Sequence, residues 1–182
     1  MKIDKLSDLF EINFKKPSVN ELLELFKLCL KYHSRLFDDD FYHANFSTPE
    51  RFLKFVRFFK NGIYCAKLGR CAKFGGFFYL YDGKITPRGA LDTKVTFCIS
   101  RPYWGFGSYM IAKKGIRFLF EKLKVRKLTV EIVGENTLAR SLIEKLGFHF
   151  EAKLKDECFR MSKPCNLYIF SMFNPAFCEA GR

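Results

Sequence analysis

Residues 97–110, FCISRPYWGFGSYM, decide the fold of this 182-residue chain. The β-prone run 97–100 enters a loop that carries Gly105 and Gly107, and a helical pattern starts at Ser108. Glycines let a backbone approach an anion closely, and the first turn of a helix offers its unpaired N–H groups. The stretch therefore predicts a strand, a loop and a helix that together hold a phosphate-bearing ligand. A plain strand-to-helix turn is the alternative.

The residues on both sides predict a mixed α/β chain. Ser18 and Glu21 have the spacing of a capping box, and Thr48-Pro49-Glu50 is typical of a helix start. Short aromatic runs separated by turns, one of them at Asp82-Gly83-Lys84, predict strands in the middle of the chain. Helices are expected near 18–34, 48–60, 108–124 and 136–147, and strands near 62–69, 73–81, 94–100, 126–133, 148–154 and 166–172. The order is ααβββαβαββ, with about four helices around a mixed sheet.

The composition indicates one folded domain with a basic surface. Apolar residues make up 48% of the chain and aromatic residues 18%, enough for a sizeable core. The length suits a single domain, 1–182. The formal net charge is +13, which favours anionic partners such as phosphate-bearing cofactors, ribosomes or nucleic acid without choosing among them.

The cysteines and the N-terminal residues exclude several classes of protein. There are seven cysteines and no CxxC pair, so we expect free thiols in a reducing compartment, with neither a disulfide framework nor a metal site. Residues 1–16 carry charges throughout, unlike a secretory signal, and no run reaches the roughly 18 apolar residues of a membrane helix. We therefore expect a cytoplasmic protein without a membrane span.

A second informative stretch of sequence follows the glycine loop. Residues 128–133, LTVEIV, predict a strand, and residues 135–151 follow as ENTLARSLIEKLGFHFE. With the glycine loop, this pattern resembles the GNAT (GCN5-related) N-acetyltransferase superfamily, and most closely its RimJ/RimL-type branch, which acetylates protein N-termini and related amines. Residues 102–107, PYWGFG, occupy the place of the family motif Q/R-x-x-G-x-G/A, with proline at its first position. The match covers 94–173, whereas 1–93 agrees only in the order of its elements.

The resemblance implies acetyl-CoA as the cofactor and a sheet whose two central strands splay to admit it. Residues 1–93 would form the acceptor side, residues 94–173 the acetyl-CoA-binding part and 174–182 a tail. The backbone of 98–100 would pair with the pantetheine arm, and the N–H groups of 103–108 would hold the pyrophosphate. The implied cofactor-binding residues are Cys98, Ile99, Ser100, Tyr103, Trp104, Gly105, Phe106, Gly107, Ser108, Asn136 and Arg140. A simple helix cap is an equally compatible role for Asn136, and a solvated helix position is the alternative for Arg140.

The catalytic positions of the family are altered in this chain. Lys94 lies near the place of the family's glutamate base, Ile143 replaces its tyrosine acid, and Ala139 replaces the serine of the RimJ/RimL-type branch. The remaining candidate acids and bases are Glu131, Ser141 and Asp92. A solvent-facing strand position is the alternative for Glu131, and an exposed helix position for Ser141.

Three further features are not expected to take part in catalysis. Cys98 has no histidine partner in the sequence, and His149 alternates with two phenylalanines on the expected solvent face of a strand. His33, Asp38–Asp40 and His43 lie between the first two helices and are expected to form a solvated loop rather than a metal site.

The favoured function is transfer of an acetyl group from acetyl-CoA to a primary amine, on a protein N-terminus or a small molecule, by direct attack. The altered catalytic positions and the charge of +13 leave an alternative: an inactive binding or assembly module of the same fold, with an anionic macromolecular partner. No signature of a dedicated nucleic-acid reader is present. The acceptor and the oligomeric state stay open.

Overall fold

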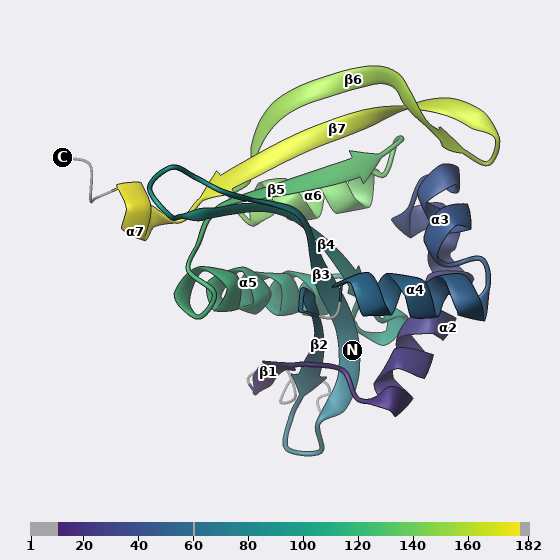
Figure 1. The fold of residues 1–182 in the computed structure, drawn as a ribbon, viewed down its shortest axis with the longest axis horizontal. Helices are drawn as coiled ribbons and strands as arrows, with labels where there is room; N and C mark the ends of the chain where they lie inside the picture. Colours follow the sequence, from purple (N-terminus) through teal and green to yellow (C-terminus); the bar gives the residue numbers. More distant parts are fainter. Residues whose placement is uncertain (1–10, 60, 179–182) are drawn as a thin grey trace.

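The computed structural model describes residues 11–59 and 61–178 of the chain, which form one seven-stranded sheet with helices on both faces (Figure 1). The strands lie in the order β1-β2-β3-β4-β5-β7-β6. Within the described residues, β4 and β5 are the only parallel neighbours. The elements are β1 (Ile12–Lys15), α2 (Val19–Leu36), α3 (Asp39–Asn45), α4 (Pro49–Phe59), β2 (Ile63–Leu68), β3 (Lys73–Ile85), β4 (Leu91–Ile99), the 3-10 turn η1 (Arg101–Tyr103), α5 (Phe106–Glu121), β5 (Val125–Val133), α6 (Thr137–Lys145), β6 (His149–Arg160), β7 (Lys163–Phe173) and α7 (Pro175–Cys178).

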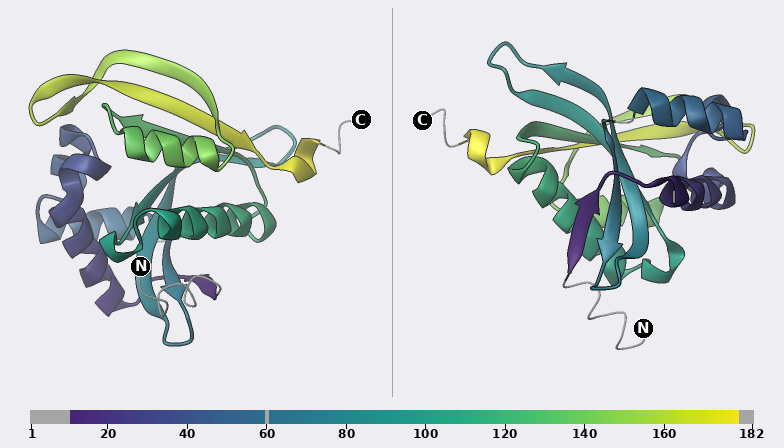
Figure 2. Two further views of the ribbon diagram at one scale, coloured as in Figure 1. Left: turned by 180° about the vertical axis from the view of Figure 1, so that it is seen from behind. Right: turned by 60° about the horizontal axis from the view of Figure 1, so that its bottom comes forward.

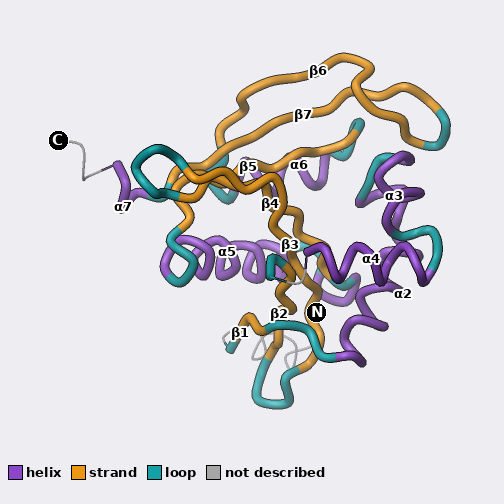
Figure 3. The backbone as a smooth tube through the Cα atoms, in the orientation of Figure 1, coloured by secondary structure: helices purple, strands orange, loops and turns teal. Residues whose placement is uncertain are grey.

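Helices α2, α3 and α4 cover one face of the sheet near the tip of the β6–β7 hairpin (Figure 3). Their core is aromatic: Phe46 and Phe55 have ring centroids 4.7 Å apart, and Phe55 meets the Tyr79 ring of β3 at 5.2 Å. Leu25 and Cys29 of α2 are fully buried against the same cluster. Because apolar residues recur along each helix at helical spacing, these helices bury a continuous stripe on the sheet.

Helices α5 and α6 cover the opposite face. Ile116 and Leu119 of α5 and Ile143 of α6 pack on Val95 and Leu128, which come from the two parallel strands. The alternation of Leu128, Val130 and Ile132 with polar residues places the apolar side chains of β5 on this face, and the polar ones point to the face of α2–α4.

The predicted mixed α/β class and the order ααβββαβαββ are confirmed, with three additions. The four-residue strand β1, the seven-residue helix α3 and the short helix α7 were not predicted. Residues Asp39–Asn45 are therefore helical where a loop was expected, because Asp38 caps α3 by accepting a hydrogen bond from Phe41 N–H at 2.8 Å. The expected turn at 82–84 is also wrong: β3 continues to Ile85 through a bulge, with Asp82 at φ 49°.

The parallel strands β4 and β5 pair along only part of their length. Their register runs from Leu91 opposite Val125 to Lys94 opposite Thr129, and there the pairing ends, although β4 continues to Ile99 and β5 to Val133. Beyond Lys94, β4 stays with β3, and β5 stays with β7 (Figure 1). The sheet therefore opens in its middle, and main-chain groups of both strands face the opening.

The long β6–β7 hairpin reaches over the molecule to α3 (Figure 2). The Asp39 carboxylate accepts hydrogen bonds from Met161 N–H at 3.1 Å and from Ser162 N–H at 2.7 Å at the hairpin tip. This contact closes one end of the face on which α2, α3 and α4 lie. In the described part of the chain, none of the helices has the length and apolar character to cross a membrane.

Candidate functional site

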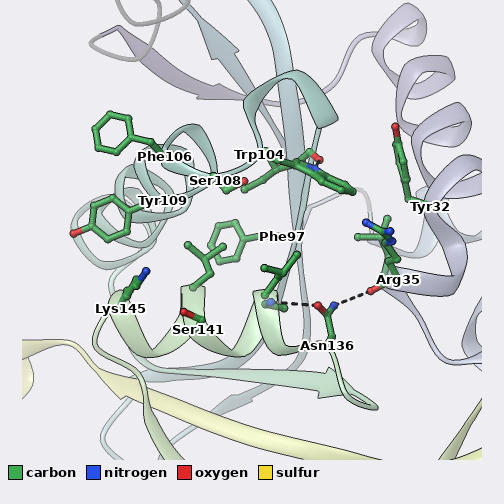
Figure 4. Close-up of a pocket in the computed structure, with 16 residues that line it drawn as sticks. Tyr32, Arg35, Phe97, Trp104, Phe106, Ser108, Tyr109, Asn136, Ser141 and Lys145 are labelled. Carbon is green, nitrogen blue, oxygen red and sulfur yellow. Dashed lines mark hydrogen bonds between the residues drawn. The ribbon is translucent and has the colours of Figure 1, made fainter. Parts of the chain in front are cut away.

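A cavity of about 700 Å³ lies beside the opening between β4 and β5. Phe97 and Ile99 of β4 form its base, on the face of the sheet that carries α5 and α6. The first turn of α5, helix α6 and the C-terminal part of α2 form its walls, so three helices that are distant in the sequence meet around it (Figure 4).

The N-terminus of α5 opens onto this cavity. The first hydrogen bond at the start of the helix runs from Tyr109 N–H to Gly105 O at 3.3 Å, so the N–H groups of Phe106, Gly107 and Ser108 precede the helical hydrogen-bond pattern. Such a turn carries a partial positive charge and favours an anion.

Gly105 itself fits an anion site. It lies at φ +86°, in the left-handed region that favours glycine, and an added Cβ would have no atom within 4 Å. The space beside the backbone is therefore open at Gly105.

Trp104 connects the loop to the opposite wall. Its indole Nε1–H donates to Ile99 O at 2.8 Å, and its ring centroid lies 5.4 Å from that of Tyr32 on α2. The Arg35 guanidinium lies 5.4 Å from the same indole (Figure 4). The side chain therefore extends across one end of the cavity.

Asn136 has both a capping role and a place in the cavity wall. Its Oδ1 accepts from Ala139 N–H at 3.2 Å at the start of α6, and its Nδ2 donates to Arg35 O at 3.1 Å (Figure 4). Because Arg160 Nη2 donates to the same carbonyl at 3.2 Å, the end of α2 is fastened both to α6 and to the β6–β7 hairpin.

The structure brings together about half of the predicted cofactor-binding residues. The predicted residues that line the cavity are Ile99, Trp104, Gly105, Phe106, Ser108 and Asn136, joined by the catalytic candidate Ser141. Tyr103 and Gly107 are buried behind this surface, and Arg140 lies outside it, with its guanidinium 4.3 Å from the Tyr168 ring.

Strand geometry separates the three predicted backbone positions of β4. Ser100 N–H donates to Gly75 O of the β3 side at 3.0 Å. Since main-chain groups alternate in direction along a strand, Cys98 and Ser100 face β3, and Phe97 and Ile99 face the opening. Cys98 is fully buried, and burial raises the pKa of its thiol, which agrees with its exclusion as a nucleophile.

Glu131 lies on the other face of the sheet, two residues beyond Thr129, the last residue of β5 that pairs with β4. Its carboxylate is 2.8 Å from Lys94 Nζ and accepts from the Tyr81 hydroxyl at 3.2 Å. Burial, and next the charge of Glu131, raise the pKa of Tyr81, so this phenol stays protonated.

Lys94 carries a second ion pair, to Asp82 at 2.9 Å. Burial alone would lower the pKa of Lys94, but the hydrogen bonds and charges of Glu131 and Asp82 outweigh it and raise that pKa. The polar cluster of Tyr81, Asp82, Lys94 and Glu131 therefore stands where β4 and β5 part, facing the side of α2, α3 and α4.

Asp92 lies away from this cluster. It pairs with Lys127 of β5 in the register, within the closed part of the strands, and its carboxylate accepts from Arg126 Nε at 2.8 Å. The structure thus separates the three catalytic candidates: Glu131 at the opening, Ser141 on the cavity wall and Asp92 in an ion pair.

Several residues of the site were not predicted. Tyr32, Arg35 and Leu36 reach the cavity from α2, and Tyr81 and Asp82 join the polar cluster from β3. The first three lie about 70 residues before the glycine loop, and Tyr81 and Asp82 lie about 50 residues before Glu131, so no local pattern connects them. Only Asp38 could have been recognised from local sequence, because aspartate is a typical helix cap. It caps α3 and thereby fixes the end of α2 relative to α3.

No protein-family model matches the chain, and no curated protein matches it in sequence. Solved structures do match. Spermidine N-acetyltransferase from Vibrio cholerae, in complex with CoA and spermine, is 14% identical with a TM-score of 0.77 and covers 93% of this chain and 99% of its own. Ribosomal-protein-S5-alanine acetyltransferase from Vibrio fischeri is 16% identical with a TM-score of 0.69, over 90% and 93% of the two chains. A GNAT-family acetyltransferase from Bacillus anthracis is 14% identical with a TM-score of 0.69, over 90% and 95%. The chain therefore has the fold of the GNAT acetyltransferases.

Proposed function

We propose that the protein is an acetyl-CoA-dependent N-acetyltransferase that acts on a primary amine. The opening of the β4–β5 pair beside the cavity carries this proposal, because it joins an anion-binding helix end on one face to a polar cluster on the other. A thioester reaching the opening from the α5 side would meet an amine arriving from the α2 side.

The cavity fits CoA in its charge and its hydrogen-bonding groups. The N–H groups at the start of α5 would hold the pyrophosphate, with room at Gly105 for its approach. The main-chain groups of Phe97 and Ile99 that face the opening would pair with the amides of the pantetheine arm. Acetyl-CoA supplies the activated acetyl group, and the cationic chain agrees with a strongly anionic cofactor.

Glu131 is the proposed base. A carboxylate can accept the proton that the attacking amine loses, and Glu131 lies at the edge of the opening, held by Lys94 and Tyr81. Ser141, on the cavity wall, is the proposed donor to the departing thiolate. Asn136 positions α6 beside the pantetheine arm. Asp92 is engaged with Arg126, which makes it the weaker candidate.

The sequence resemblance and the structural neighbours suggest two classes of acceptor amine. The RimJ/RimL-type pattern favours a protein N-terminal amine, and the neighbour from Vibrio fischeri is named for an alanine of ribosomal protein S5. The neighbour from Vibrio cholerae is named for spermidine, a small polyamine. An acetylation assay with acetyl-CoA should therefore include an alanine-initiated peptide and spermidine.

The first test is CoA and acetyl-CoA binding by calorimetry with wild type and Gly105→Glu. Wild type is expected to bind at micromolar strength, and the variant to lose binding because it places a negative charge where the pyrophosphate would lie. Gly105→Ala is the matched control: it imposes the same positive φ on a side chain at a cost of about 1 kcal/mol but adds no charge. Circular dichroism checks the fold. A well-folded wild type that binds neither ligand would overturn the proposal.

A further inference from the structure

Trp104 is the single tryptophan of the chain, and it contacts both walls at one end of the cavity. Trp104 is 36% exposed, so contacts rather than deep burial hold its side chain in place. Those contacts are the hydrogen bond to Ile99 O on β4, the aromatic contact with Tyr32 on α2 and the cation–π contact with Arg35 on α2 (Figure 4).

The carbonyl of Ile99 is one of the groups that face the opening. Its direction follows from the alternation along β4, in which Ser100 N–H is committed to Gly75 of the β3 side. An amide N–H of a ligand lying between β4 and β5 needs such an acceptor, because a buried amide without a partner is costly. The indole N–H already donates to this oxygen at 2.8 Å, and the indole ring occupies the space beside it at the cavity wall.

The same indole reaches α2 where that helix is irregular. Tyr32 lies at φ −120° and ψ 17°, outside helical geometry, and α2 continues for one more turn to Leu36. Arg35 belongs to that last turn and also meets the indole. The position of Trp104 is thus tied to the piece of α2 that lines the cavity.

We propose that Trp104 is a displaceable latch: its indole covers the Ile99 carbonyl at the free end of β4, and bound CoA would take over that carbonyl and move the indole outward. This inference rests on the proposed function, since it takes the pantetheine amide as the competing donor. The latch lowers the affinity for CoA by the free energy of the contacts that the ligand must break.

The single tryptophan makes the movement directly measurable. With excitation selective for tryptophan, quenching by acrylamide reports the accessibility of Trp104 alone. Saturating CoA is expected to raise the quenching constant about twofold or more, because the indole leaves the cavity wall. A lower quenching constant with bound CoA would mean that the ligand covers an indole that stays in place, and would overturn the latch.

Two substitutions test the hydrogen bond separately. Trp104→Phe removes the N–H donor, so CoA binding should tighten about threefold to tenfold, the range of one neutral hydrogen bond. Trp104→His keeps a ring N–H at the position equivalent to the indole nitrogen, and its affinity should stay closer to that of wild type. Weaker binding by Trp104→Phe would show that the indole is part of the bound site and not an obstacle to it.

Calorimetry with the wild-type protein distinguishes failure of the proposed function from failure of the latch. Absence of CoA binding by a folded wild type removes the proposed function. Binding with unchanged or reduced quenching, or with weaker affinity in Trp104→Phe, removes the latch and leaves the proposed function standing.

Discussion

At the scale of single residues, the chemistry of the site depends on Glu131. If it is the base, Glu131→Gln should lower kcat by about 10²- to 10⁴-fold, because the amide cannot accept a proton. KM for acetyl-CoA should change little, since Glu131 lies on the face opposite the cavity. Steady-state rates of the two proteins at one pH measure both effects.

Asp92→Asn is the informative partner of that variant. The structure places Asp92 in an ion pair with Arg126, so its amide variant should lose stability rather than catalysis. A large loss of kcat in Asp92→Asn with an active Glu131→Gln would assign the base to the other carboxylate.

Glu135 provides a pH-dependent contribution to stability. The Tyr168 hydroxyl donates to it at 2.7 Å, and this bond is the largest of the contacts that lower the pKa of Glu135 below the usual value of a glutamate, against a smaller opposing effect of burial. A carboxyl group whose pKa is lower in the folded state stabilises the fold above its unfolded pKa, and this contribution is lost as the pH falls through the folded value. Tyr168→Phe should therefore show a smaller loss of stability between pH 7 and pH 3 in urea unfolding. An identical loss in both proteins would contradict the assignment.

The residues that could be predicted from the sequence are those whose role is local. Gly105 and Asn136 belong to short patterns whose backbone geometry is fixed by their neighbours in the chain, and the structure places both at the cavity. Tyr81 and Tyr32 could not be found in this way, because strand pairing and helix packing bring them to the site from distant segments.

At the scale of elements, α6 is fixed by its first residue. Asn136→Ala should cost about 1 kcal/mol in the free energy of unfolding through loss of the helix cap, and more through loss of the bond to Arg35 O. Asn136→Asp keeps the capping oxygen but loses the Nδ2–H donor, so it should retain most of the cap contribution. Urea unfolding of wild type and the two variants separates the contribution of the helix cap from that of the bond to Arg35 O. Equal stability of the alanine and aspartate variants would show that the cap contributes nothing.

The long elements were predicted because their apolar spacing is regular over many residues. Strand β1 and helix α3 are too short for such a pattern: β1 is recognisable only through its pairing with β2, and α3 through the cap at Asp38. The continuation of β3 past Tyr81 was hidden by Asp82-Gly83, a sequence typical of a turn that here forms a bulge. The local sequence indicates a change of backbone direction at Asp82-Gly83, whereas the pairing with β4 keeps β3 a strand beyond this point.

At the scale of the whole molecule, the aromatic core beneath α2, α3 and α4 carries much of the stability. Phe46 is fully buried and stacks on Phe37 at 4.6 Å, so Phe46→Ala should lose about 3–5 kcal/mol, a large part of the stability of a typical domain. Phe58→Ala is the matched control, because Phe58 is 81% exposed and its loss should change stability by less than about 0.5 kcal/mol. Thermal unfolding compares the two. A similar shift in both would contradict this assignment of the core.

The sheet also crosses the boundary between the two predicted parts of the chain. The β3–β4 pair joins β1, β2 and β3 to β4, β5, β7 and β6 in one hydrogen-bonded sheet. The single domain 1–182 stays a prediction. The predicted cytoplasmic location and the association with ribosomes or nucleic acid stay predictions. For the latter, binding that weakens steeply with salt is the expected observation.

The parting of β4 and β5 has a consequence for amide hydrogen exchange. Thr96 and Cys98 face β3 and Phe97 and Ile99 face the opening, so neighbouring amides of one central strand should exchange at alternating rates, slow and fast. Such a pattern is unusual in the middle of a sheet, where protection is normally continuous. A ligand that fills the opening would slow the fast pair alone, and β4 would then be protected along its whole length.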